Sequence, residues 1–137
     1  MTLRVLSLGW GVQSKTLAAM IALKEIPPVD FALHSDTSHE MSGTYAHAAK
    51  WPPWLEEHGV KVVTVTVDRP DVVRAWTQSV SVMIPAFTTD NLDGSRGQVR
   101  RQCTHDWKIM PMRRFIRTVI DRPRLGAVES VLGISYD

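Results

Sequence analysis

The stretch GWGVQSKT, from Gly9 to Thr16, holds the residues most suited to binding a phosphate group. It directly follows the apolar run LRVLSL and leads into a helical pattern. Glycine lets the backbone approach a ligand closely, and the amides at the start of a helix attract an anion. Gly9, Gly11 and Ser14 are therefore candidate phosphate ligands, and Ser7, at the end of the apolar run, is a further hydroxyl donor. The alternative role for Ser14 is a helix N-cap, which serine favours without any ligand.

Two other phosphate loops share part of this pattern. A Walker A loop, G-x-x-x-x-G-K-[ST], matches at its first glycine, its lysine and its threonine, but it requires glycine where Ser14 stands. A dinucleotide fingerprint, G-x-G-x-x-G, fails at the same serine, and Asp36 lies beyond the usual distance for its ribose-binding acid. A tight turn without a ligand is the remaining alternative.

A second polar group, SDTSHE, ends the next apolar run. Asp36 could accept a ribose hydroxyl or hold Mg²⁺ through water, or it could be an ordinary solvated acid at a strand end. His39 is a candidate contact for an anionic ligand, since histidine changes charge near neutral pH. His39 and Glu40 could also act as an acid–base pair or as metal ligands. Because their spacing, with the neighbouring histidines, matches no known ligand signature, no metal site is predicted.

The third group surrounds the single cysteine. Cys103 stands between Arg101 and Lys108 at the expected start of a helix. Cations and a helix N-terminus favour the thiolate, so Cys103 and Lys108 are the candidate catalytic residues. Arg101 and Lys108 are also the best candidates to bind a terminal phosphate or sulfate. The alternative for Cys103 is a small buried hydrophobe.

Basic residues are concentrated in one part of the chain. The segment Arg96–Arg124 carries nine arginines and lysines against Asp106 and Asp121, whereas the first 95 residues are net acidic and the whole chain has a net charge of +2. Such a segment is either a solvated helix face or a surface for phosphate and sulfate groups, including those of a nucleic acid.

The elements that must position these groups follow from the apolar patterns. Strands are predicted at Leu3–Leu8, Val29–Ser35, Lys61–Val67 and Val128–Ile134. Helices are predicted at Val12–Lys24, Ser42–His58, Asp71–Gln78 and Thr104–Ile120. Pro52 and Pro53 should kink or restart the second helix, and Pro111 should kink or delay the last one. An irregular stretch is expected over residues 79–102.

Strands that alternate with helices predict a parallel sheet covered on both faces, a three-layer α/β/α fold of about four strands. In such a sheet, ligands bind beyond the carboxyl ends of the strands. The turn at 9–14 and the segment 36–40 both follow a strand end. We therefore expect the polar groups to meet at one edge of the sheet.

Length and composition fit one globular domain. The 137 residues are 44% hydrophobic and 22% charged. No apolar run reaches the roughly 18 residues that a membrane span needs. A single cysteine excludes an internal disulfide and an iron–sulfur cluster held within one chain. We therefore expect a reducing, cytoplasmic setting.

Three ordered segments and the closing strand resemble one family. SLGWGVQS, residues 7–14, resembles the pyrophosphate loop of the ATP-pyrophosphatase and phosphoadenylylsulfate (PAPS) reductase superfamily, in the S-x-G-x-G-V-Q-S form often found in phages. SDTSHE, followed by Thr44 and Tyr45, resembles the D-T-G segment after the second strand. RQCTHDWKIMP, residues 101–111, resembles the cysteine-bearing segment, and LGIS, residues 132–135, resembles the strand before an acidic and arginine-bearing tail.

The resemblance implies a Rossmann-related fold of the adenine nucleotide α-hydrolase type. Its ligand would be ATP or an adenylylated sulfate, with Mg²⁺ as an optional companion, and it implies phosphate-binding roles for Gln13 and Thr37. The chain departs from the family pattern at Trp10, which replaces a small residue beside the expected phosphate path. It departs again at Ser38, which replaces the glycine of D-T-G, and at its end, where relatives continue.

The expected reaction is cleavage between the α and β phosphates with adenylyl transfer, or thiol-based reduction of a sulfonucleotide. The alternatives are a non-catalytic module that binds nucleotide or nucleic acid, and a component of nucleic-acid sulfur modification. The C-terminal cysteine of true PAPS reductases is absent, so the resemblance implies nucleotide binding more strongly than reduction. We expect one domain over residues 1–137, shortened relative to the family, with a strand edge that suits a homodimer.

Overall fold

The computed structural model describes residues 2–38, 40–66, 104–121 and 124–134, together with two-residue strands at 87–88 and 97–98. Its centre is a four-stranded sheet with the strand order β3-β2-β1-β6. The strands are β1 Leu3–Ser7, β2 Phe31–Asp36, β3 Val62–Thr66 and β6 Val128–Val131. All neighbouring strands of this sheet are parallel, as the sequence predicted.

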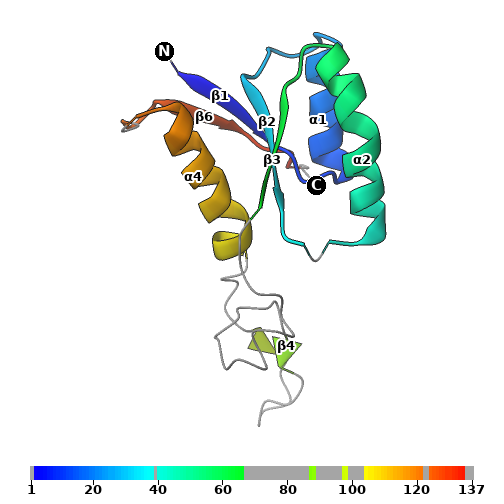
Figure 1. The fold of residues 1–137 in the computed structure, drawn as a ribbon, viewed down its shortest axis with the longest axis vertical. Coiled ribbons are helices and arrows are strands. Elements are labelled where there is room, and N and C mark those ends of the chain that lie inside the picture. The colour runs from blue at the N-terminus through cyan, green and yellow to red at the C-terminus, as the bar shows by residue number, and fades with distance from the viewer. Residues whose placement is uncertain are drawn as a thin grey trace.

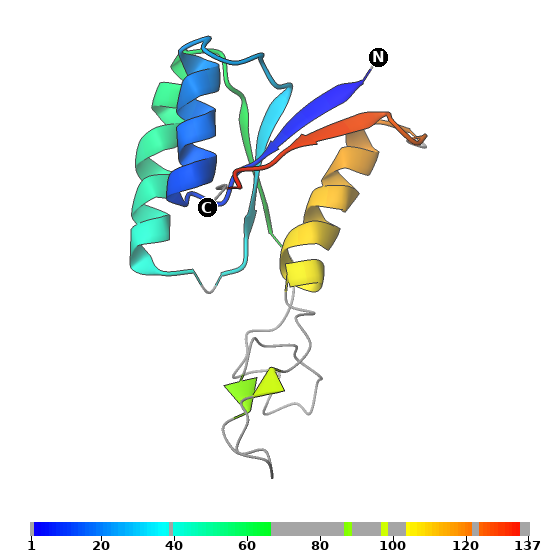
Figure 2. The same ribbon diagram turned by 180° about the vertical axis from the view of Figure 1, so that it is seen from behind.

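Helices cover both faces of the sheet (Figure 1). Helices α1 Val12–Ala22 and α2 Ser42–Glu57 lie on one face. Helix α4 Met110–Val119, with the preceding π-helical turn η1 Thr104–Ile109, lies on the other. Figure 2 shows the same three layers from behind. The predicted three-layer α/β fold with a parallel sheet is confirmed.

The strand order reverses direction between β1 and β6. From β1 the chain proceeds outward to β2 and β3, and it then crosses to β6 on the other side of β1. In open parallel sheets, the crevice beyond the carboxyl ends at such a reversal is the usual place for a ligand. The turn that follows β1 begins at this point of the fold.

The main core lies between the sheet and the α1–α2 layer. Leu6 of β1, Leu8 directly after β1 and Ala32 of β2 are buried on this side. The other buried members of the core are Trp10, Ala18, Ile21, Ala22, Val29, Leu55 and Val60. On the opposite face, Phe31 meets Phe115 of α4 edge-on, with ring centroids 5.7 Å apart. Strand β2 is buried over residues 32–35 because it lies inside the sheet and helices cover both faces.

The prediction that the second helix restarts at its proline pair is wrong, because α2 continues through Pro52 and Pro53. Each proline lacks an N–H and removes one helical hydrogen bond. The neighbouring Trp51 and Trp54 pack against the main core and Leu55 is part of it, so tertiary burial offsets this loss. Gly59 follows the end of α2 with φ +83°, the left-handed conformation in which glycine commonly terminates a helix.

Pro111 delays the last helix, as predicted. The chain is π-helical over 104–109, and the regular α-helix begins at Met110. Pro111 therefore falls in the first turn of α4, where a missing N–H costs little.

Part of the prediction lies outside the described residues. This applies to the helix at Asp71–Gln78 and to the stretch 79–102, within which only the antiparallel strands β4 Phe87–Thr88 and β5 Gly97–Gln98 are described. Among the described helices, none is long and apolar enough to cross a membrane. The single domain and the homodimer stay predictions.

Candidate functional site

The turn after β1 brings the Ser14 hydroxyl back onto its own backbone. Ser14 Oγ accepts a hydrogen bond from the Gly9 amide at 3.1 Å and lies 3.5 Å from the Gly11 carbonyl oxygen. The N-cap of α1 is Gly11, with no side-chain cap, so the alternative of Ser14 as the N-cap is wrong. A helix start that lacks a capping side chain is suited to an anion.

Trp10 fixes this turn to the core. Its backbone lies in the left-handed region with φ +59°, and its side chain is 3% exposed within the main core. The Trp10 side chain is therefore directed into the core, while the phosphate path beside its backbone stays a prediction. Positive φ costs a bulky residue roughly 1–2 kcal/mol, which burial of the indole offsets. The Trp10 Nε1 atom is buried without a hydrogen-bond partner among the described residues.

Two hydrogen bonds hold the residue that leads into the turn. The Leu8 amide donates to the Leu33 carbonyl at 2.9 Å, and His34 Nδ1 donates to the Leu8 carbonyl at 2.9 Å. His34 is buried, and its ring meets Trp10 edge-on with a centroid distance of 5.9 Å. This bond gives a buried polar ring the partner that it needs. The backbone of Gly9 therefore starts from a fixed point at the carboxyl end of β1.

Gly133, two residues after β6, closes the other side of the turn. A Cβ atom at this position would lie 2.7 Å from Ser14 N and 2.9 Å from the carbonyl carbon of Gln13. Glycine permits this approach without displacing the start of α1. No local pattern in the sequence marks Gly133 as part of the site, because the signal is a contact between residues far apart in the chain.

Lys15 helps to decide between the alternative loops. Its ammonium group lies 5.7 Å from the centroid of the Trp51 ring on α2. In a Walker A loop, the lysine at this position reaches the phosphates. Here the lysine is held over an aromatic ring in the α1–α2 layer, so the geometry disfavours the Walker A alternative.

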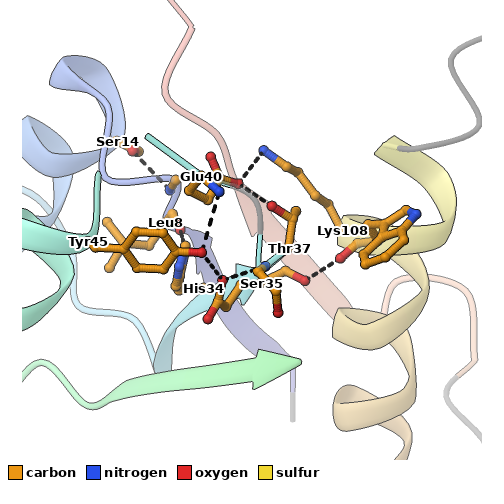
Figure 3. Close-up of polar contacts among 12 residues, drawn as sticks. Leu8, Ser14, His34, Ser35, Thr37, Glu40, Tyr45 and Lys108 are labelled. Carbon is orange, nitrogen blue, oxygen red and sulfur yellow. Dashed lines mark hydrogen bonds and ion pairs between the residues drawn. The ribbon is translucent and has the colours of Figure 1, made fainter. Parts of the chain in front are cut away.

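Asp36 organises the segment between β2 and α2 (Figure 3). Its Oδ1 atom accepts hydrogen bonds from the Ser38 amide at 2.8 Å and from the Tyr45 hydroxyl at 3.1 Å. Ser38 has φ +61°, a conformation that glycine adopts most easily. This explains in physical terms why a glycine would suit the position that Ser38 occupies.

Glu40 joins the same segment to η1 (Figure 3). Glu40 Oε1 accepts a hydrogen bond from Thr37 Oγ1 at 3.0 Å and pairs with Lys108 Nζ at 3.2 Å. Ser35 Oγ donates a buried hydrogen bond of 2.6 Å to the Trp107 carbonyl, which ties η1 to the carboxyl end of β2. Lys108, the next residue, is thereby held close to the strand ends.

A small pocket of about 50 Å³ opens between β1, β2 and the facing helical segment. Its walls consist of Ser7, Leu8, Gly9, Leu33, His34, Ser35, Glu40, Lys108 and Met112. This volume suits about one or two water molecules or a single small group.

The structure brings part of the predicted site together. The pocket is lined by Ser7, Gly9 and Lys108 from the predicted set, and by Glu40, which the sequence suggested only as an acid–base or metal-binding residue. The other described candidates lie beside the pocket-lining segments. Gly11 precedes α1, Gln13 and Ser14 lie in its first turn, Asp36 ends β2 and Thr37 follows it.

Three predicted site residues, His39, Arg101 and Cys103, lie outside the described residues, and their roles stay predictions. Within the described part of the chain, no group of three or more histidine, cysteine, aspartate or glutamate side chains could hold a metal ion.

Comparisons with protein-family models, with curated proteins and with solved structures return no match to this chain. Fold and geometry therefore define its class, a small α/β protein with a four-stranded parallel sheet.

Proposed function

We propose that the turn after β1 binds the phosphate chain of an adenine nucleotide, either ATP or an adenylylated sulfate. One observation carries the proposal: Gly9, whose amide is bonded to Ser14, lines the same pocket as Lys108. The turn offers backbone amides and a hydroxyl, and the facing segment offers a cation. Both lie at the carboxyl ends of the central strands, where parallel sheets bind ligands.

A phosphate oxygen can replace the bonds that the turn makes within itself. In the free chain, the Gly9 amide donates to Ser14 Oγ, and the Ser14 hydroxyl donates to the Gly11 carbonyl. Both groups are able to donate to a phosphate oxygen, and bonds to a charged acceptor are stronger than bonds between neutral groups. Because the pocket is small, the nucleotide would lie across its mouth with one small group inside.

The adenine part of the proposal rests on the resemblance to the PAPS reductase and ATP-pyrophosphatase superfamily. The left-handed backbone of Ser38 supports it, because the family pattern has glycine there. The reaction that fits is cleavage between the α and β phosphates, in which the amides of the turn and Lys108 would stabilise the developing negative charge. Sulfonucleotide reduction would require Cys103 as the thiol.

Mg²⁺ is part of this proposal as a companion of the nucleotide. Asp36 and Glu40 supply carboxylates beside the strand ends, and Mg²⁺ is usually held by one or two carboxylates together with phosphate oxygens. We place the protein in the cytoplasm because a single cysteine fits a reducing compartment.

Isothermal titration calorimetry with ATP and with adenylylsulfate tests the proposal. Ser14→Ala should weaken binding by about 5- to 30-fold, the effect of losing a hydrogen bond to a charged group worth roughly 1–2 kcal/mol. Thr16→Ala is the matched control, since the Thr16 hydroxyl bonds to the Val12 carbonyl inside α1 at 2.8 Å. It should leave affinity unchanged. Equal affinity of the wild type and a folded Ser14→Ala variant, shown by circular dichroism, would overturn the proposal.

A further inference from the structure

Three exposed arginines lie close together on α4. Arg113, Arg114 and Arg117 all belong to the regular part of the helix, and all three are exposed to solvent. Residues three and four positions apart share one side of a helix, so the three side chains form a single surface about 6 Å long along the axis. We call this surface the arginine face.

The opposite side of α4 packs against the sheet. Pro111 is buried, Met112 lines the pocket, and Phe115 packs against Phe31 of β2. These contacts fix the rotation of the helix about its axis, so the arginine face is held toward solvent. They also occupy the apolar side of the helix.

No ion pair joins Arg113, Arg114 or Arg117 to an acidic side chain within the described part of the chain. The ion pairs there join Lys108 to Glu40 and Arg4 to Glu129. Like charges at these spacings destabilise a helix. The other helix layer differs, since α1 and α2 together carry two lysines and two glutamates. The arginine face therefore retains an uncompensated charge that a bound polyanion would neutralise.

We propose that the arginine face binds the sugar–phosphate backbone of a nucleic acid. A guanidinium group donates paired hydrogen bonds to phosphate oxygens, and a short row of three suits successive phosphates of one strand. Binding of this kind depends on charge and on salt and does not read sequence. The face is separate from the proposed nucleotide site, whose residues lie in η1 and in the turns after β1 and β2.

A lipid surface fits this face less well. A helix that lies in a membrane interface inserts its apolar side, and α4 uses that side against the sheet. A nucleic acid needs the charged side alone.

Fluorescence anisotropy with a labelled single-stranded DNA of about 20 nucleotides tests the proposal. Three phosphate contacts predict that the logarithm of the association constant falls with the logarithm of salt concentration with a slope of about −2. The double variant Arg114→Gln with Arg117→Gln should weaken binding by about tenfold or more at low salt and reduce the slope by more than half.

The double variant Lys24→Gln with Lys50→Gln is the matched control, because it removes the same charge from the α1–α2 layer. It should change affinity less than about twofold. Equal losses in the two double variants would mean that net charge alone acts, and absence of binding by the wild type would mean that the face has no such ligand. Either result overturns the proposal.

Two further experiments identify the partner and distinguish this proposal from the proposed nucleotide binding. Vesicles containing phosphatidylserine should not bind through the arginine face. If the arginine variants lose vesicle binding and keep DNA binding, the proposal is overturned. Ser14→Ala should leave DNA binding unchanged, so failure of the nucleotide proposal leaves this result intact. Loss of DNA binding in a folded Ser14→Ala variant would contradict the separation of the two surfaces.

Discussion

The two helix layers that cover the sheet differ in both packing and charge. Helices α1 and α2 cover the main core, and their lysines and glutamates balance. On the other face, the contacts of η1 and α4 with the sheet include the ring pair of Phe31 and Phe115 and a buried hydrogen bond from Ser35, and these segments carry Lys108 and three exposed arginines. The comparison suggests that stability is concentrated on the first face and recognition of anions on the second. The turn after β1 lies where the two meet.

The largest expected effect tests the difference in packing. Leu6→Ala removes a fully buried side chain from the main core and should lower the free energy of unfolding by about 3–4 kcal/mol. Met112→Ala removes the same number of heavy atoms from the other face, where Met112 is partly exposed at the pocket. It should cost about 1 kcal/mol, because less surface leaves water. Urea denaturation followed by circular dichroism measures both values. An equal loss of unfolding free energy in the two variants would contradict the difference in packing between the two faces of the sheet.

The sequence was sufficient to predict most of the fold. Apolar runs and helical spacing placed the four strands of the parallel sheet and helices α1 and α2 to within three residues of their observed bounds, and the helix predicted from Thr104 covers η1 and α4 together. The short strands β4 and β5 were not predicted, since they lie in a stretch expected to be irregular. The proline pair of α2 was a further exception, because local propensity predicts an interruption there. Burial of Trp51, Trp54 and Leu55 overrides it, and a pattern along the chain does not reveal which neighbours a helix will bury against.

The candidate site was less predictable, for a related reason. The glycine–serine turn and Lys108 could be proposed because their chemistry is visible locally. The orientation of Trp10 could not be predicted, since it depends on a backbone φ of +59° that directs the side chain into the core. Gly133 and the pairing of Glu40 with Lys108 depend on contacts between distant segments, which become visible once the strands are placed side by side.

The prediction with an intermediate effect concerns the contact between Gly133, which follows β6, and the start of α1 after the turn at β1. Gly133→Ala places a Cβ atom 2.7 Å from Ser14 N, so the start of α1 must shift. We expect a loss of about 1–3 kcal/mol in unfolding free energy, together with weaker ATP binding. Gly43→Ala is the control, because nothing lies within 4 Å of its added Cβ and alanine favours a helix. It should be neutral or slightly stabilising. A neutral Gly133→Ala would mean that the turn does not depend on this close packing.

The smallest expected effect tests whether the charge of Lys108, in η1, contributes to the binding of ATP. Glu40 is 21% exposed and Lys108 is 49% exposed, so their ion pair contributes little to stability. The Glu40 carboxylate nevertheless pairs with the Lys108 ammonium group, which we propose as a phosphate ligand. Glu40→Gln should therefore raise the affinity for ATP without Mg²⁺ by about two- to fivefold, more at low salt than at high salt.

Glu129→Gln is the matched control for this last prediction. Glu129 pairs with Arg4 at 3.0 Å at the amino end of the sheet, so its replacement removes the same charge from an ion pair that lies away from the pocket. Calorimetry should show unchanged ATP affinity for Glu129→Gln and a gain for Glu40→Gln. A loss of affinity in Glu40→Gln that occurs only with Mg²⁺ would mean that Glu40 binds the cation of the nucleotide. No difference between the two variants would mean that Lys108 does not contact the phosphates of ATP, and binding of the nucleotide would then rest on the turn after β1 without this lysine.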